Sequence, residues 1–257
     1  MKNKTIHTEQ GHWLLAKMGK KVLRPGGKKL SLKLVKELDI SPKDIVVEFA
    51  PGMGLTAALL LAENPAYYVG VELNEEAASR LAHKIGGQCA VLNTTAAKTG
   101  LDSESVDKVL GEAMLTMQAD HRKTEIMREA RRILRPGGLY GIHELGLMPD
   151  DIDIESKKDI QRNLAKLMHV NARPMTRTVW ETFLEKEGFK VKEVYSAPMR
   201  LLEPKRLLKD EGLMGALRIG TNVMARPKAR KKILNMRSVF QDYADHLNAC
   251  GIIAEKI

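Results

Sequence analysis

A glycine-rich turn between a strand-like run and a helix-like run constrains the fold of this chain more than any other feature. Asp44 to Phe49 is rich in β-branched residues, and Thr56 to Ala62 has the composition of a helix. Between them, Gly52-Met53-Gly54-Leu55-Thr56-Ala57 fits the pattern G-x-G-x-x-G/A. In that pattern the glycines let the backbone approach a ligand closely at the start of the helix. The spacing predicts a strand–turn–helix unit with a ligand at the turn.

Strands and helices alternate from this turn to about residue 150. Further strands are expected over Tyr67–Leu73, Gln88–Leu92, Val106–Leu110 and Leu139–Glu144, with helices over 75–85 and 120–134. Such alternation is typical of right-handed βαβ units, which build a parallel sheet with helices on both faces.

The flanking segments are expected to be mainly helical. Before the core we expect helices over Glu9–Leu23 and Lys28–Leu38, separated by Arg24-Pro25-Gly26-Gly27, since proline and glycine interrupt helices. After it we expect helices over 154–170, 176–187 and most of 203–247, and strands over Phe189–Ala197 and Gly251–Lys256. In the last helix an apolar stripe is expected to pack inward, formed by Ile233, Met236, Phe240, Tyr243 and Leu247. The predicted fold class is α/β, a doubly wound domain with an N-terminal helical cap (1–40), a core (41–150) and a region (151–257) that adds a helical lid and the last two strands.

Positive charge is concentrated in the two flanks. The net charge is +10, and residues 1–40 carry ten Lys and Arg against three acidic residues, while residues 151–257 carry 21 against 14. A basic excess fits an anionic partner, and it equally serves solubility. The run Arg226-Pro227-Lys228-Ala229-Arg230-Lys231-Lys232 could contact nucleic acid phosphates. The aromatic fraction of only 4% argues against a surface that stacks RNA bases.

Composition also predicts the compartment. Met1 to Gln10 lacks an apolar signal core, and no apolar run approaches the length of a membrane span. Two cysteines, Cys89 and Cys250, are too few for a spaced metal cluster. We therefore expect a cytoplasmic protein without a metal site or a membrane span. The sequence makes no prediction of the oligomeric state.

Two carboxylates indicate the kind of cofactor. Glu72 ends the second strand 18 residues after Gly54, where an acid accepts hydrogen bonds from ribose hydroxyls. Glu48 lies four residues before Gly52, where a carboxylate would repel a pyrophosphate but suit a cofactor with a positive centre. S-adenosylmethionine (SAM) has a sulfonium, an ammonium and a ribose. The alternative is that Glu48 only pairs locally.

Three segments resemble the motifs of class I SAM-dependent methyltransferases. Val46-Val47-Glu48-Phe49-Ala50-Pro51-Gly52-Met53-Gly54 resembles the first motif of that family, and Val69-Gly70-Val71-Glu72-Leu73-Asn74 resembles the acidic second motif. Arg131 to Gly138 is similar to the segment that precedes strand five in the family. The branch that includes ubiquinone and menaquinone methyltransferases is the comparison that comes nearest. The resemblance implies a Rossmann-like, seven-stranded, mostly parallel sheet whose final strand is antiparallel.

The resemblance also implies roles for individual residues. Glu48, Gly52 and Gly54 would line the methionine part of SAM, with Ala50 in the same loop. Glu72 would hold the ribose and Leu73 would lie beside the adenine. Where the family has an acid that contacts the adenine amine, this chain has Asn93, Thr94 and Thr95. Glu112 ends strand four, where the transferred methyl group lies in the family. The basic residues Lys20, Lys21, Arg24, Lys28 and Lys29 could meet an anionic substrate or close over the carboxylate of the cofactor.

The chemistry needs a positioned nucleophile, and a base only if that nucleophile must lose a proton. The candidate bases at strand ends are Glu112, His143 and Glu144, with a purely structural histidine as the alternative for His143. The predicted function is methyl transfer from SAM to a small-molecule acceptor, as in small-molecule metabolism. The alternatives are an RNA- or protein-modifying methyltransferase, a NAD-dependent oxidoreductase and a SAM-binding sensor without catalysis. Gly111-Glu112-Ala113-Met114 lacks the paired prolines common in enzymes that methylate base amines, which disfavours nucleic acid as the acceptor.

Overall fold

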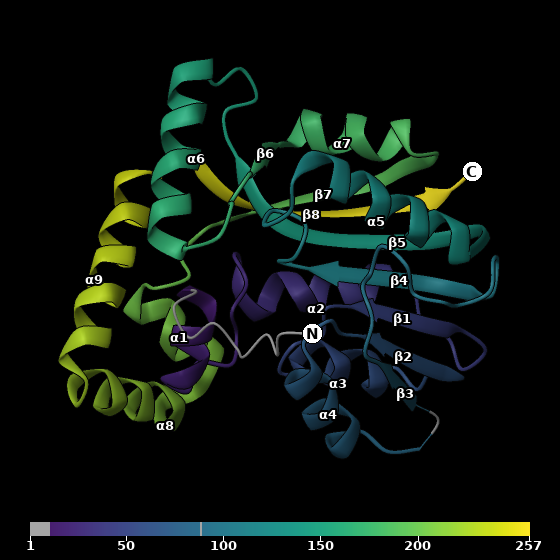
Figure 1. Cartoon of the computed structure of the whole chain (residues 1–257), viewed down its shortest axis with the longest axis horizontal. Coiled ribbons are helices and arrows are strands. Elements are labelled where there is room, and N and C mark those ends of the chain that lie inside the picture. The colour runs from purple at the N-terminus through teal and green to yellow at the C-terminus, as the bar shows by residue number, and fades with distance from the viewer. Residues whose placement is uncertain (1–10, 88) are drawn as a thin grey trace, which may run out of the picture.

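Runs of β-branched and apolar residues form the centre of a mixed sheet (Figure 1). The computed structural model describes residues 11–87 and 89–257. Five strands pair in parallel, namely β1 (Ile45–Phe49), β2 (Tyr67–Val71), β3 (Cys89–Leu92), β4 (Val106–Glu112) and β5 (Leu134–Leu147). The order across the sheet is β3-β2-β1-β4-β5-β8-β7, in which β8 (Leu247–Lys256) runs antiparallel to β5 and to β7 (Phe189–Pro198). The predicted doubly wound, mostly parallel α/β fold with an antiparallel last strand is confirmed.

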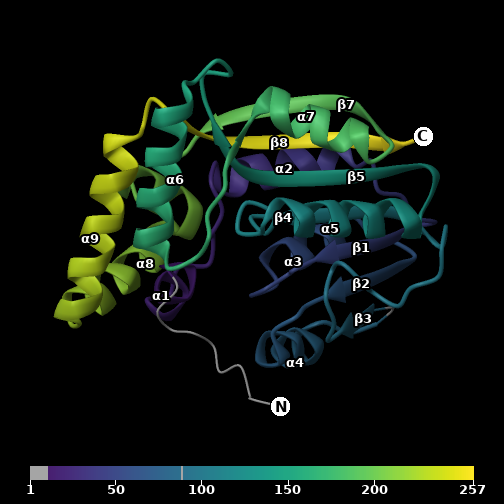
Figure 2. The same cartoon turned by 45° about the horizontal axis from the view of Figure 1, so that its top comes forward.

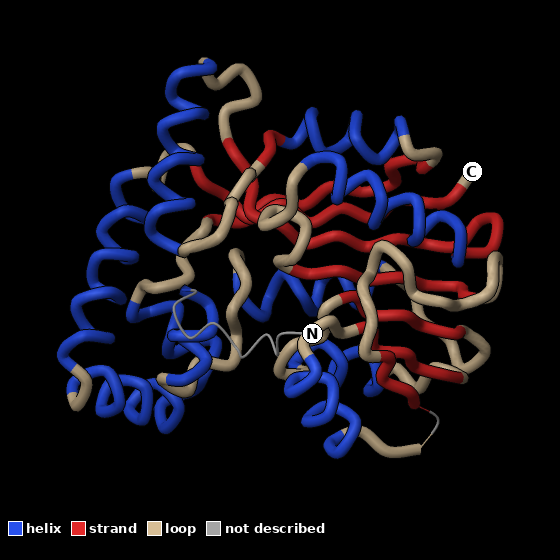
Figure 3. Tube along the Cα trace, in the orientation of Figure 1, coloured by secondary structure: helices blue, strands red, loops and turns tan. Residues whose placement is uncertain are grey.

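Helices cover both faces of the sheet, because successive side chains of a strand point to opposite faces. Val46 of β1 packs with α2 (Gly27–Glu37), α3 (Leu55–Ala62) and α4 (Glu75–Lys84). Val47 and Phe49 pack in the other cluster, with α5 (Asp120–Ile133) and α7 (Arg177–Lys186). Figure 3 shows the strands enclosed between these two helical layers. The second helix of the expected N-terminal cap is therefore part of one layer of the core.

The remaining helices gather beyond the carboxyl end of the sheet (Figures 1 and 2). They are α1 (Gly11–Lys17), α6 (Ile154–Met168), α8 (Pro204–Met224) and α9 (Pro227–Asp242). Apolar side chains of α1, α6 and α9 form a third cluster with residues of β5 and β8, where Leu147 and Leu247 are buried. We call these four helices the helical region.

Several predicted boundaries are wrong. The first helix ends at Lys17 instead of Leu23, because Gly19 takes a φ of 99° that a helix does not allow, and its expected start at Glu9 lies outside the described residues. The fifth strand begins at Leu134 instead of Leu139, so residues 135–138, which were expected to form a turn, lie within β5. The pairing of β4 with β5 is irregular there, because Val106 pairs with Leu134 and Lys108 with Leu139. Leu247 opens β8 and is not part of the last helix, although it packs in the same cluster as that helix.

Other differences concern short elements. The two-residue strand β6 (Met175–Thr176), which the sequence did not predict, pairs with β5. Gly212 breaks the helical path of α8, with φ 72° and ψ 171°. None of the helices in the described ranges 11–87 and 89–257 is both long and apolar enough to cross a lipid bilayer.

The topology creates a crevice where the chain order reverses. From β1 the chain continues to β2 and β3 on one side, whereas β4 and β5 lie on the other side of β1. Helices that connect strands on opposite sides leave a gap above the carboxyl ends of the two central strands, which is where ligands bind in open α/β sheets. The loops after β1 and β4 therefore border the expected site.

The packing of α2 against the sheet can be tested by substitutions on its buried and exposed faces. Leu34 is completely buried, whereas Leu32 on the same helix is 46% exposed. Leu34→Ala should lower the free energy of unfolding by about 2–5 kcal/mol, because it leaves a cavity against the sheet. The control Leu32→Ala should change it by less than about 0.5 kcal/mol. Urea denaturation measures both, and equal effects would contradict the packing of α2.

Candidate active site

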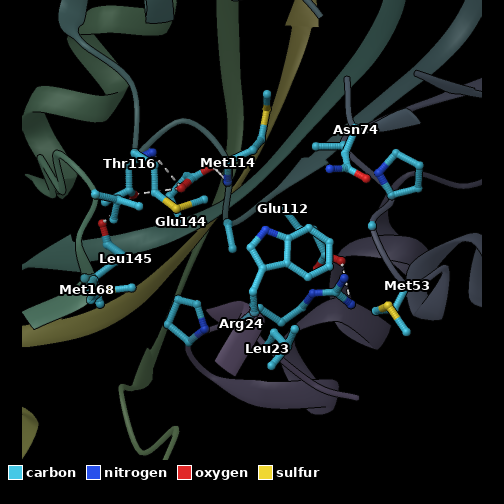
Figure 4. A pocket seen from close by; sticks show the side chains of 18 of the residues that line it. Leu23, Arg24, Met53, Asn74, Glu112, Met114, Thr116, Glu144, Leu145 and Met168 are labelled. Carbon is cyan, nitrogen blue, oxygen red and sulfur yellow. Dashed lines mark hydrogen bonds and ion pairs between the residues drawn. The ribbon is translucent and has the colours of Figure 1, made fainter. Parts of the chain in front are cut away.

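A cavity of about 600 Å³ lies above the carboxyl ends of β1, β2 and β4. This volume is within the range of about 300–1,000 Å³ found for small-molecule sites. One wall consists of the loops that follow the strands, and the other comes from the helical region and from residues 18–26, which we call the strap (Figure 4).

The loop after β1 brings the backbone to the floor of the cavity. Ala50 and Gly52 line the cavity, and Gly54 begins α3 with a left-handed φ of 73°. A Cβ atom at position 54 would lie 2.6 Å from Cδ1 of Leu81 on α4. Both the conformation and the close approach require glycine there, which gives a physical reason for the second glycine of the motif.

Glu72 connects the loops that follow β1 and β2. Its carboxylate accepts hydrogen bonds from the backbone N–H groups of Gly52 (3.0 Å) and Asn74 (2.9 Å), and the residue is 8% exposed. Asn93, after β3, donates from Nδ2 to the carbonyl oxygens of Glu72 (2.9 Å) and Leu73 (3.2 Å). Glu72, Leu73 and Asn93 all line the cavity.

Four residues expected at the cofactor do not line the cavity, and they are Glu48, Gly54, Thr94 and Thr95. Glu48 lies on the same face of β1 as Val46, the face that packs against α2, α3 and α4. There it is 2% exposed and accepts a hydrogen bond of 2.6 Å from the Tyr68 hydroxyl. Burial raises the pKa of Glu48 to about 8, against the lowering effect of the Tyr68 hydrogen bond. Thr94 turns its hydroxyl to the carbonyl of Lys98 (3.1 Å). The alternative in which Glu48 only pairs locally is the one that the geometry supports.

Glu112, at the end of β4, is the centre of a buried polar network. Its carboxylate accepts hydrogen bonds from the Thr56 hydroxyl at the start of α3 and from Nδ1 of His143 (2.7 Å), and Nη1 of Arg24 lies 3.0 Å from it. Arg24 also donates to Thr56. Burial would raise the pKa of Glu112, but the Arg24 charge and the hydrogen bond from His143 outweigh it and lower the pKa to about 2. The carboxylate is therefore ionised near neutral pH, and it is engaged by three protein side chains.

His143 has no exposed surface and does not line the cavity. Its Nδ1 faces Glu112, and its Nε2 faces the carbonyl oxygen of Pro25 at 2.6 Å. Both partners are acceptors, so each ring nitrogen is directed at a protein atom and not at the cavity. This geometry contradicts the expectation that His143 is a base, because neither nitrogen has a lone pair directed at a substrate.

Glu144, the third candidate base, organises the loop after β4. Its carboxylate accepts hydrogen bonds from the backbone N–H groups of Met114 (2.9 Å), Leu115 (2.7 Å) and Thr116 (3.0 Å) and from the Thr116 hydroxyl (2.7 Å). Burial raises the pKa of Glu144, although these hydrogen bonds oppose the shift. The carboxylate borders the cavity, but its four donors leave it a structural acceptor (Figure 4).

Part of the cavity wall was not identified from the sequence. Arg24 and Leu23 of the strap enter the cavity (Figure 4), although the surrounding turn was interpreted mainly as a helix interruption. The only signal available was the cluster of basic residues 20–29, which suggested contact with a substrate or with the cofactor carboxylate. The other contributors are apolar side chains from α1, α6 and α9 and from the loops after α6 and β7, namely Trp13, Met168, Val170, Met199, Leu201 and Phe240.

Comparisons with known proteins agree with this architecture. Residues 47–142 match the family described as methyltransferase domain. A phosphoethanolamine N-methyltransferase 2 from Haemonchus contortus superposes with a TM-score of 0.73 at 17% identity, over 99% of this chain and 58% of that one. The cyclopropane synthase MmaA2 from Mycobacterium tuberculosis has a TM-score of 0.67 at 14% identity, over 89% of this chain and 83% of that one.

The family match spans the glycine loop, Glu72, Glu112 and the start of β5, all of which contribute to or support the cavity. The chain belongs to the class I SAM-dependent methyltransferases, and SAM is its cofactor. It is also 32% identical over 253 residues to an uncharacterized protein from Haemophilus influenzae, covering 96% of this chain and 98% of that protein. The match to the methyltransferase family, and not this relative, decides against the alternative of a NAD-dependent oxidoreductase.

Glu48 predicts a specific dependence of stability on pH. Its pKa in the folded protein is about 8 and lies above the ordinary value of 4.5, so the folded state holds a proton that the unfolded state has released. From this group, the free energy of unfolding is highest below pH 4.5 and falls by up to about 1.4 kcal/mol for each pH unit as the pH rises to 8. Glu48→Gln should remove that slope, so the variant gains stability relative to the wild type as pH rises from 5 to 8. Parallel urea titrations measure the difference, and a constant difference would show that Glu48 is not a buried neutral acid.

His143 offers a test that separates a structural role from a catalytic one. His143→Leu removes the hydrogen-bonding contacts with Glu112 and with the Pro25 carbonyl and should lower the free energy of unfolding by about 2–4 kcal/mol. It should also weaken SAM binding, because the strap loses one of its anchors. Calorimetric denaturation and titration measure the two effects. A variant of unchanged stability and SAM affinity that has lost only its turnover would identify His143 as a base.

Proposed function

We propose that this methyltransferase acts on a small, largely apolar acceptor. The observation that carries the proposal is the composition of the wall contributed by the helical region, where Trp13, Met168, Val170, Met199, Leu201 and Phe240 line the cavity. Such a surface desolvates an apolar molecule but offers few hydrogen bonds. An acceptor held there lies next to Ala113 and Met114, which follow Glu112.

The wall formed by the strand loops fits SAM. The Glu72 carboxylate at the cavity surface would accept hydrogen bonds from the ribose hydroxyls, and the exposed side chain of Leu73 would cover the adenine. Ala50 and Gly52 present backbone to the methionine part, and Asn93 supplies an amide near the adenine. Glu112 adds a fixed negative charge near a cationic cofactor. The other expected residues, Glu48, Gly54, Thr94 and Thr95, lie outside the cavity lining and are not proposed to contact SAM.

The surroundings of the three candidate bases favour catalysis by positioning of the reactants over catalysis by a base. SAM supplies a methyl group on a sulfonium, which is already activated as an electrophile. Glu112 and Glu144 accept hydrogen bonds from protein donors, and both ring nitrogens of His143 face protein acceptors, not the cavity. These side chains therefore fix the loops and the strap that align the acceptor and exclude water, which alone can supply several kcal/mol of barrier reduction. The nucleophile of the acceptor would attack the methyl group with its own lone pair as the bond between that methyl group and the sulfur breaks, and any proton that the product must lose would pass to bulk water after release.

We further propose that cofactor binding and acceptor selection are carried out by different segments of the chain. The core 41–150 holds the cofactor, while the strap in 1–40 and the helices in 151–257 choose the acceptor. A cytoplasmic location is part of the same proposal and is supported by the two thiols Cys89 and Cys250, neither of which is in a disulfide. An acceptor on RNA or protein is a weaker alternative, because the cavity wall is apolar and enclosed by the strap.

The role of Glu72 can be tested by calorimetric titration. Glu72→Ala should reduce SAM affinity by about tenfold to a hundredfold, since a hydrogen bond to a charged group contributes about 1.5–3 kcal/mol. Glu76→Ala is the matched control on the first turn of α4, because Glu76 lies outside the cavity and pairs with Arg80. Wild-type affinity in Glu72→Ala would show that the ribose is held elsewhere.

The acceptor class is tested by following conversion of SAM to S-adenosylhomocysteine with apolar phenols and amines, in parallel with RNA and protein extracts. Turnover should appear with an apolar small molecule, and Phe240→Ser should raise KM for that molecule more than it changes SAM affinity. The residue is 8% exposed and lines the cavity away from the cofactor loops. Turnover with RNA or protein alone would overturn the proposal.

A further inference from the structure

An apolar stripe on α8 is exposed although large apolar side chains are usually covered. Six of the fourteen most exposed large apolar side chains of the described residues lie on α8 and α9, and these are Leu208, Leu213, Met214, Leu217, Met224 and Leu234. Met214 is 79% exposed, and Leu213 and Met224 are each 64% exposed. Such a concentration on one pair of helices indicates a surface with a partner.

The stripe is regular because the helix restarts after its break. Gly212 interrupts the helical path, so residues 213–224 form a separate straight segment. Leu213, Leu217 and Met224 follow one another at steps of four and seven, and Met214 precedes Leu217 by three. Residues at these steps share one face of a helix, so the four side chains form a continuous apolar strip.

The charges around this strip are almost all positive. Residues 204–242 carry ten Lys and Arg but only three acidic residues. Two of those acids, Asp210 and Glu211, turn their side chains inward and are 4% and 2% exposed. The third, Asp242, is the last residue of α9. The exposed basic residues are Lys205, Lys209, Arg218, Arg226, Lys228, Arg230 and Lys231.

Apolar and basic side chains meet at the turn between the two helices. Nη1 of Arg230 on α9 lies 3.9 Å from Sδ of Met224 at the end of the stripe. Figures 1 and 2 show α8 and α9 at the outer edge of the helical region. An apolar strip flanked by cations is the pattern of helices that lie in the interface of an anionic bilayer, where the strip enters the acyl region and the cations meet headgroup phosphates.

We propose that the α8–α9 surface docks this methyltransferase on an anionic lipid bilayer. Charge complementarity selects this partner, since the exposed charges near the stripe are cationic. A nucleic acid would use the cations but not the apolar strip. The helices lie on the bilayer without crossing it, which agrees with their length and composition.

The strap connects this surface to the active site. Glu211, at the break in α8, accepts hydrogen bonds from the backbone N–H groups of Lys21 (2.8 Å) and Val22 (2.9 Å). The next residues of the strap, Leu23 and Arg24, line the cavity. The strap therefore links α8, the helix proposed to contact the bilayer, directly to the wall of the cavity. If the acceptor is apolar, as the proposed function states, the docked enzyme would take that acceptor from the lipid.

Vesicle flotation of the full-length protein tests the docking without any methyl transfer. Wild-type protein should float with vesicles of phosphatidylcholine and phosphatidylglycerol, float less with phosphatidylcholine alone, and lose binding as salt rises. The triple variant Leu213→Ser, Leu217→Ser and Met224→Ser should lower partitioning about tenfold or more. The control Ile154→Ser removes a side chain that is 69% exposed at the start of α6 and should bind as the wild type does.

Two further measurements keep the proposal falsifiable. SAM titration of each variant reports whether the fold is intact, and Lys228→Glu with Lys231→Glu should abolish the preference for anionic vesicles. Failure of the wild type to float would overturn the proposal, as would a triple variant that floats normally. Sedimentation velocity that shows a dimer broken by the triple variant, without vesicle binding, would assign the stripe to a second copy of the chain instead. None of these outcomes depends on the identity of the acceptor.

Discussion

The ionised carboxylate of Glu112 is the interaction on which the site depends. It joins the end of β4, the start of α3, the end of β5 and the strap through Thr56, His143 and Arg24. The Arg24 charge and the hydrogen bonds from His143 and Thr56 compensate for the cost of burying it, so that its pKa falls to about 2 despite its burial. Without this network, the strap would have no polar anchor on the sheet, and one wall of the cavity would lose its position.

The same principle of a buried acid with several donors recurs nearby. Glu144 holds the loop after β4 with three backbone N–H groups and a hydroxyl, and Glu72 holds the loops after β1 and β2. Each carboxylate replaces the water that its loop would otherwise bind, which stiffens the irregular backbone between strands and helices. The cavity is thus bordered by loops that are already ordered for a ligand. The variable part is the helical region, whose apolar side chains suit both the proposed acceptor and a location near lipid.

Much of the fold could be predicted because its determinants are local in sequence. The alternation of β-branched runs with amphipathic helices between residues 44 and 134 predicts most of the parallel strands in their order, and the glycine loop predicts the side of the sheet on which the ligand lies. The boundaries fail where one residue changes the backbone, as at Gly19, or where a strand continues into a turn, as at Leu134. The apolar stripe of the last helix was correctly assigned to packing, except that Leu247 belongs to β8.

The sequence by itself determined the α/β fold, the cofactor loop and the acid at the end of β2, because each depends on residues close together in the chain. Only the tertiary structure decided what the remaining acids and the histidine do. Glu112 and His143 are 31 residues apart, and they meet because β4 and β5 pair in the register that sets them side by side. Pro25 and Arg24 reach them from more than 80 residues away. Whether an ionisable side chain is a base or a structural anchor depends on which donors and acceptors surround it, and that environment exists only after distant segments have packed.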